Sequence, residues 1–227
     1  MVSMTQRHLA VMTLEVTMLE GDAPLVISSQ VLNRQDGEDE YHVPEAAMGE
    51  AGDPRKAAAF EGRVLVPEEH YAREDRMMLG YRCANSQMTI AVAADHSLMT
   101  DDEHEVVLRQ HEDLTKYVVR VEATEGRTVR LEKTVAYHSS RGVPVRELSD
   151  RCDRTLDRAA RHGVDHYLEE QREWYERFWR HAGVDVPGDD AQQQAIRFNL
   201  FTLAQSTARA DQQGVPAKGV SGSGYEG

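Results

Sequence analysis

The last six residues, GSGYEG at 222–227, carry the letters of the G-x-G-x-x-G motif that binds dinucleotide phosphates. In proteins that use this motif, a strand precedes the glycines and a helix begins over the phosphates. Here a helical segment precedes them, and no strand–helix–strand unit is found along the chain. We therefore interpret the segment as a glycine-rich loop, whose backbone can approach a ligand or a neighbouring element closely.

Metal-ligand spacings are weak in this sequence. His162 and His166 are four residues apart, as zinc ligands on a helix are, but Gly163 lies between them and no third ligand is near. The acidic stretch 101–104 could take a cation, although a solvated turn is the favoured interpretation. The acidic run DGEDE at 36–40 lacks calcium-loop spacing. No metal is expected.

Other chemistry-bearing patterns also have structural explanations. Aromatic residues cluster at Trp174, Tyr175, Phe178 and Trp179, and such residues stack on sugars in many enzymes. At helical spacing they are more typical of packing between a helix and the sandwich. No G-x-S-x-G elbow for a serine nucleophile is present, and 39 Asp and Glu residues make paired carboxylates uninformative. The residues alone therefore reveal no active site.

Composition limits the kind of protein. The chain has 227 residues, 40% of them hydrophobic, which is typical of a globular protein. A formal net charge of −13 disfavours nucleic acid and anionic membranes as partners. The first residues contain no long apolar run, and Cys83 and Cys152 are too few for a disulfide framework. We expect a cytosolic protein without a cofactor.

Residues 1 to about 140 predict an antiparallel β-sandwich, because short alternating runs are separated by turn signals. In the first run, Met12, Leu14, Val16 and Met18 alternate with mostly polar residues, which predicts a half-buried strand. A long acidic loop follows from Arg34 to Lys56. The predicted strands are 10–18, 24–33, 62–67, 77–83, 86–95, 105–110, 115–123 and 128–138.

Helices follow from about residue 145. Val145, Leu148, Cys152, Leu156 and Ala159 recur at steps of three and four, which predicts an amphipathic helix that ends at Gly163. A second helix is predicted up to Gly183. A third is predicted from about 190 to 213, with Asp189 or Asp190 as its N-cap and with Ile196, Leu200 and Leu203 as its apolar stripe.

Four strings resemble glycoside hydrolase family 65. They are SSQVLNRQDGEDE at 28–40, MLGYRCANSQMTIAVAADH at 78–96, VPVRELSDRCDRTLDRA at 143–159 and the segment 196–227. The last is the most specific, since it looks like the first helix of that family's barrel and the glycine-rich loop after it. The family contains maltose, trehalose, kojibiose and nigerose phosphorylases and some hydrolases of the same disaccharides.

The resemblance implies a mixed β-then-α fold. Residues 1–140 would be part of an antiparallel super-β-sandwich, 141–188 a helical linker, and 189–227 the first helix of an (α/α)6 barrel. The family pattern continues with sugar-binding residues and a general-acid Glu that this sequence does not contain. The opening VSMTQRHLAVMTLEV also resembles an internal strand of the sandwich, so a fragment truncated at both ends is expected. The exposed barrel helix and the loop after it, residues 190–227, are expected to exchange amide hydrogens fast and to promote self-association.

The implied chemistry is cleavage of an α-glucosidic disaccharide with inversion, by phosphorolysis or by hydrolysis. Inorganic phosphate would be the co-substrate of a phosphorylase. On the loop after the barrel helix, Lys218 could complement an anion, Tyr225 could stack on a sugar and Glu226 could accept from hydroxyls. No catalytic residue is expected within the chain, and the isolated chain is expected to be inactive.

Two other interpretations remain open. One is a stand-alone β-sandwich that binds sugar or mediates dimerisation, and the other is a decayed gene product. A homodimer through the sandwich domain is also left open. An in-frame continuation of the gene on either side would favour the enzyme fragment.

Overall fold

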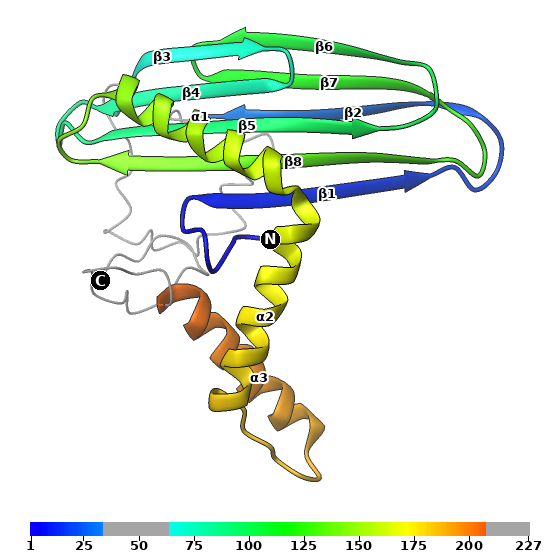
Figure 1. The fold of residues 1–227 in the computed structure, drawn as a ribbon, viewed down its shortest axis with the longest axis vertical. Coiled ribbons are helices and arrows are strands. Elements are labelled where there is room, and N and C mark those ends of the chain that lie inside the picture. The colour runs from blue at the N-terminus through cyan, green and yellow to red at the C-terminus, as the bar shows by residue number, and fades with distance from the viewer. Residues whose placement is uncertain (34–63, 208–227) are drawn as a thin grey trace, which may run out of the picture. The chain divides into compact units, whose positions relative to one another are not determined.

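The computed structural model describes residues 1–33 and 64–207 (Figure 1). Among these residues the chain divides into two compact units. The first contains Met1 and His8–Val164, and the second contains Val2–Arg7 and the residues from Asp165 onward. Each unit is described by itself.

The first unit holds two antiparallel sheets. The larger has the order β1-β8-β5-β4-β3, and the smaller has the order β2-β7-β6. The strands are β1 (Leu9–Thr17), β2 (Ala23–Leu32), β3 (Leu65–Arg73), β4 (Arg76–Cys83), β5 (Thr89–Met99), β6 (His104–His111), β7 (Leu114–Ala123) and β8 (Thr128–Ser140). The predicted run of short antiparallel strands is confirmed.

The two sheets enclose an apolar core. The smaller sheet contributes Ile27, Tyr117, Val119 and Val121, and the larger contributes residues such as Met77 and Ala94. These residues lie at every second position of their strands, because successive side chains point to opposite faces of a sheet. The predicted alternation in β5 and β8 therefore marks the inner face of the larger sheet.

Helix α1 (Val145–His162) packs on the outer face of the larger sheet, against β4, β5 and β8 (Figure 1). Its predicted stripe is confirmed: Val145, Leu148, Cys152, Leu156 and Ala159 are all buried. Gly80 of β4 lies beneath the first turn of α1 and leaves room for it, since a Cβ at Gly80 would lie 2.4 Å from Cγ1 of Val145. Gly163, with φ of 79°, ends the helix as predicted.

Strand β1 is half-buried only in part on its predicted face. Val16 and Met18 are partly buried, whereas Met12 and Leu14 are 55% and 45% exposed. Alternation identifies the two faces of a strand and leaves open how far another layer covers each of them. The third predicted strand was misplaced, since β3 begins at Leu65 and runs to Arg73.

The second unit contains α2 (Val164–Ala182) and α3 (Asp190–Thr207). Asp189 caps α3 as predicted, since its Oδ1 accepts a hydrogen bond from the Gln192 amide at 2.9 Å. Tyr175 of α2 stacks on Phe201 of α3, with ring centroids 5.7 Å apart. None of the helices in the described ranges is apolar over a length that would cross a membrane.

We expect α3 to exchange its amide hydrogens faster than α1. Ala204 is the one buried residue of α3, and Phe198 and Leu203 are 64% and 55% exposed. Of the apolar stripe predicted to be exposed, Leu203 is exposed, whereas Ile196 and Leu200 are partly buried. Helices with few buried contacts open locally at little free-energy cost. Hydrogen exchange followed by mass spectrometry on dilute protein measures this. Equal protection of the two helices would contradict the expectation.

Candidate functional site

The predicted substrate-binding residues Lys218, Tyr225 and Glu226 lie outside the described residues. Their proposed contacts with sugar or phosphate are therefore untested. Within the first unit, three polar clusters join elements that are distant in sequence.

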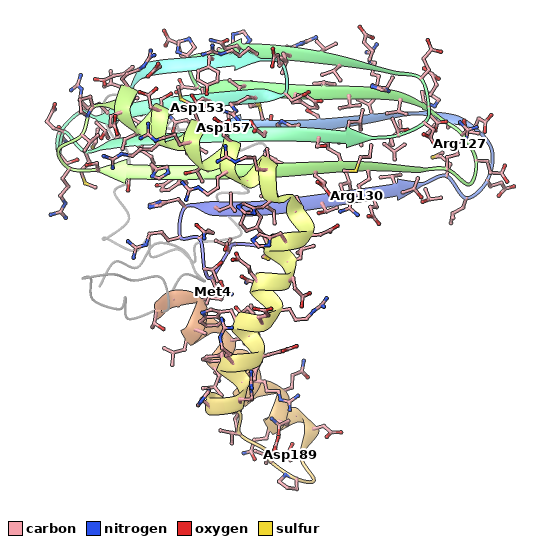
Figure 2. All side chains as sticks on the ribbon, viewed as in Figure 1. Met4, Arg127, Arg130, Asp153, Asp157 and Asp189 are labelled. Atoms are coloured by element: carbon pink, nitrogen blue, oxygen red, sulfur yellow. The ribbon has the colours of Figure 1, made fainter. Side chains whose placement is uncertain are left out.

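The first cluster, the arginine junction, consists of Arg76, Tyr71, Asp95, Asp153 and Asp157. Arg76 of β4 donates a hydrogen bond to each carboxylate oxygen of Asp95 of β5, with Nε–Oδ1 at 2.6 Å and Nη2–Oδ2 at 2.8 Å. It also donates to Asp153 at 3.0 Å and to Asp157 at 2.8 Å. Asp153 and Asp157 both come from α1 (Figure 2).

Tyr71 of β3 completes the junction by donating its hydroxyl hydrogen to Asp153 at 2.5 Å. Burial and this hydrogen bond raise the pKa of the phenol well above its ordinary value. The hydrogen bonds that Arg76 donates to Asp95 raise the pKa of its guanidinium, which therefore stays charged. All three carboxylates bond Arg76, so the junction holds α1 on the sheet and offers no free acid or base.

The second cluster lies between the two sheets. Nδ1 of His96 is 3.1 Å from the carbonyl oxygen of Asp75, and Nε2 is 2.8 Å from Oγ of Ser29. A carbonyl only accepts, so Nδ1 carries the hydrogen and Nε2 accepts from Ser29 in the neutral ring. Tyr117 stacks on the imidazole at 4.2 Å and donates to the Asp75 carboxylate at 3.0 Å.

A serine hydroxyl on a histidine nitrogen is also the arrangement of an activated nucleophile. Here His96 is 4% exposed and lies flat against Tyr117. Burial lowers its pKa to about 4, so the ring is neutral at physiological pH. We interpret the pair as a link between the sheets, because substrate has no access to the imidazole.

The third cluster closes the end of the sandwich around Asp102. Its carboxylate accepts from the Thr124 amide at 3.0 Å, from the Thr124 hydroxyl at 2.9 Å and from Arg127 at 2.9 Å. The backbone hydrogen bond is the main cause of its lowered pKa. The solvated turn predicted for 101–104 is therefore wrong for Asp102, which is buried and ties two loops together.

The remaining predicted patterns have structural partners. His166 lies 3.6 Å from Glu170, and no cluster of three metal-binding side chains occurs in the described parts of the chain. Cys83 and Cys152 are both free thiols, as expected. Burial raises the pKa of Cys152 to about 12, which makes that thiol unreactive.

A model of the glycosyl hydrolase family 65 N-terminal domain matches residues 1–178. The chain belongs to glycosyl hydrolase family 65. An uncharacterized glycosyl hydrolase of Mycobacterium leprae is 31% identical over all of this chain and 27% of its own length. The alpha,alpha-trehalose phosphorylase of Thermoanaerobacter brockii is 31% identical over 79% of this chain and 23% of its own length.

The fold agrees with this assignment. A solved structure of a candidate kojibiose phosphorylase from the human microbiome superposes with a TM-score of 0.70 at 11% identity, over 91% of this family 65 chain and 24% of that one. The family 65 chain thus spans about a quarter of the length of the relatives it matches. Its fold is that of the N-terminal part of such an enzyme.

Sequence reasoning did not identify the three clusters of this family 65 chain. One signal was present: the alternation Met88-Ile90-Val92-Ala94 continues to His96 and places that residue on the inner face. The arginine junction had no comparable signal, since Arg76 and Asp153 are 77 positions apart.

Proposed function

We propose that this chain is the sandwich and linker part of an enzyme that cleaves α-glucosidic disaccharides with inversion, by phosphorolysis or hydrolysis. The supporting observation is the family match over residues 1–178 together with relatives that include a trehalose phosphorylase and a kojibiose phosphorylase. In a phosphorylase of this kind a carboxylic acid protonates the glycosidic oxygen while phosphate attacks the anomeric carbon.

Within that enzyme the role of the described residues is positional. Gly80 and the arginine junction attach α1 to the larger sheet, so the sandwich and α1 form one rigid support. Rigid supports favour catalysis because small displacements of reacting groups are costly. Lys218, Tyr225 and Glu226 are proposed as substrate contacts on the loop that follows, with phosphate contacting Lys218.

Two of the described carboxylates, those of Asp102 and Glu147, are poorly suited to act as the general acid. A catalytic acid needs a raised pKa so that it holds a proton at neutral pH. Asp102 and Glu147 have pKa values that are shifted in the opposite direction, because each carboxylate accepts hydrogen bonds, including from arginine. We propose that the catalytic acid is contributed by residues outside this chain, as the resemblance to family 65 implies.

We expect the purified 227-residue chain to release neither glucose nor glucose 1-phosphate from trehalose, kojibiose or maltose, with or without inorganic phosphate. The measurement is a coupled assay of both products, with an active disaccharide phosphorylase as positive control. Product that rises in proportion to the chain, and that disappears on heat denaturation, would show that the chain has its own acid. Sequencing the DNA on both sides of the reading frame tests the parentage, since an in-frame continuation encoding a barrel is expected.

A further inference from the structure

Lys133 lies on the inner face of the larger sheet, among apolar neighbours. It is on the same side of β8 as Leu131 and Val135, which pack into the core of the sandwich. Strands β1 and β5 flank β8 (Figure 1), and they place Met12 and His96 directly opposite Lys133. Side chains that are directly opposite on one face lie close together. The amine is therefore held at the end of a half-buried stem.

The ε-amine of Lys133 bonds a backbone carbonyl group. Its Nζ donates to the carbonyl oxygen of Gln30, in β2 of the smaller sheet, at 2.9 Å. A carbonyl oxygen carries no full charge, so it accepts a hydrogen bond from a neutral amine as well as from an ammonium ion. A carboxylate in the same place would favour the ammonium form. The bond to Gln30 therefore positions the nitrogen and leaves both charge states available.

The carboxylates of the strands around Lys133 lie on the other side of the sheet. Strand β2 contains no charged residue. In β1, β5 and β8 each carboxylate bonds an arginine on the outer face; these residues are Glu15, Asp95 and Glu132. Among the described residues, Lys133 thus has no carboxylate that would stabilise its positive charge.

The titratable group that faces Lys133 is His96, whose imidazole is neutral at physiological pH because it is buried. The nearby Asp75 carboxylate accepts from the hydroxyl of Tyr117 at 3.0 Å and also acts on His96. Neither group offsets the burial of the amine, and this burial lowers the pKa of Lys133. More of the amine is therefore neutral near pH 7 than in an ordinary lysine.

A neutral, half-buried lysine has the properties of an amine nucleophile. Only the neutral form has a lone pair that can attack a carbonyl carbon, and desolvated lysines form Schiff bases for this reason. The chain has four lysines, at positions 56, 116, 133 and 218. Of these, Lys116 is also described and half-buried, but it lies on the outer face of β7. It provides an internal reference for the reactivity of Lys133.

From these observations we propose that Lys133 is a covalent binding site for small aldehydes such as open-chain aldoses. The lone pair of Nζ forms a bond to the carbonyl carbon, and one amine hydrogen moves to the carbonyl oxygen. That oxygen then leaves as water together with the second amine hydrogen, and an imine remains. The step needs no oxidant or reductant, and hydrolysis of the imine reverses it.

The test uses the full chain with glyceraldehyde, the smallest aldose, and with cyanoborohydride, which reduces the imine to a stable secondary amine. Peptide mass spectrometry at low conversion then compares the two described lysines. At about pH 7 we expect Lys133 to react about threefold faster than Lys116 or more, since more of it is neutral. This preference should disappear in urea. Equal rates in the folded chain, or a slower reaction at Lys133, would overturn the proposal.

Two variants at Met12 separate the charge next to the amine from the packing around it. Met12 is 55% exposed, so a polar side chain of similar size should be tolerated there. Met12→Glu places a carboxylate opposite Lys133, which should stabilise the ammonium form and slow its reaction about threefold or more. The matched control, Met12→Gln, adds no charge and should leave the rate unchanged. Equal rates in the two variants would contradict the proposal.

Lys133→Arg identifies the reacting atom. Arginine keeps a positive charge and a donor for the Gln30 carbonyl, but its guanidinium stays protonated and is no amine nucleophile. The modified peptide around position 133 should therefore disappear while Lys116 reacts as before. Persistence of that modification would show that another group takes the aldehyde. None of these measurements depends on whether the parent enzyme cleaves disaccharides.

Discussion

Between about pH 7 and about pH 4, the free energy of unfolding is expected to fall by about 6 kcal/mol through two buried histidines alone. His96 and His138 are 4% and 9% exposed, and burial lowers the pKa of each to about 4, from 6.5. In the unfolded chain both imidazole rings bind protons once the pH falls below 6.5, their ordinary pKa. The folded chain excludes those protons until about pH 4, so acid favours unfolding.

The groups that face each ring explain why the charged form is disfavoured. Around His96, Lys133 opposes the imidazolium, while the Asp75 carbonyl and the carboxylates of Asp75 and Asp95 only partly offset the burial. The protons therefore bind more weakly to the folded chain, and the stability is present above about pH 6.5 and lost as the pH falls towards 4.

Among the described residues, no carboxylate offsets the burial of His138. It stacks on His8 with ring centroids 4.0 Å apart, its Nε2 lies 3.1 Å from the Thr155 hydroxyl, and Arg151 and Arg154 add positive charge. Each histidine contributes about 3 kcal/mol to the expected loss.

Urea unfolding at a series of pH values measures this dependence. Between about pH 6.5 and about pH 4, His96→Gln and His138→Gln should each lower the slope of the free energy of unfolding against pH by about 1.4 kcal/mol per pH unit. The double variant should lower this slope by twice that amount. NMR titration of the two imidazoles provides an independent measurement. If either ring titrates near its ordinary value, the histidine in question is more accessible than the structure indicates.

Replacing Arg76 with Met is expected to lower the free energy of unfolding by about 3 kcal/mol. The guanidinium bonds Asp95, Asp153 and Asp157, and its side chain is 23% exposed. Without it three carboxylates repel one another across the junction of β5 and α1. The loss should appear first as faster amide exchange in α1, since that helix provides two of the three partners.

Two matched variants separate charge from geometry. Arg76→Lys keeps the charge and loses the bidentate hydrogen bonding to Asp95. The free energy of unfolding of this variant should therefore lie between those of the wild type and Arg76→Met. Asp157→Asn alters a partner that is 57% exposed, and solvent screening should limit its effect to about 1 kcal/mol or less. Equal losses in Asp157→Asn and Arg76→Met would show that the junction is not centred on Arg76.

Much of the fold could be predicted because periodicity is local. The stripe from Val145 to Ala159 identified the buried face of α1, since helical residues three and four apart lie on one side. The alternation in β5 and β8 identified strands and their apolar faces for the same reason. The resemblance to family 65 was carried by four strings and is confirmed by the match over residues 1–178.

The candidate site was predicted less well, because polar clusters depend on contacts between distant segments. Ser29 and His96 are 67 positions apart, and Tyr71 and Asp153 are 82 apart. No spacing rule joins such residues before the sheets are assembled. The positions expected to contact substrate, Lys218, Tyr225 and Glu226, stay a prediction because they lie outside the described residues.

The amino-acid sequence by itself therefore determined the antiparallel strands, the helix that follows them and the family. Each of these depends on short-range spacing or on strings of neighbouring residues. Only the tertiary structure decided which apolar faces are covered. The same alternation describes β8, where Val129 is buried, and β1, where Met12 is exposed. The difference arises because a strand's pattern specifies two faces, while the number and order of strands in the opposite sheet decide which face meets another layer.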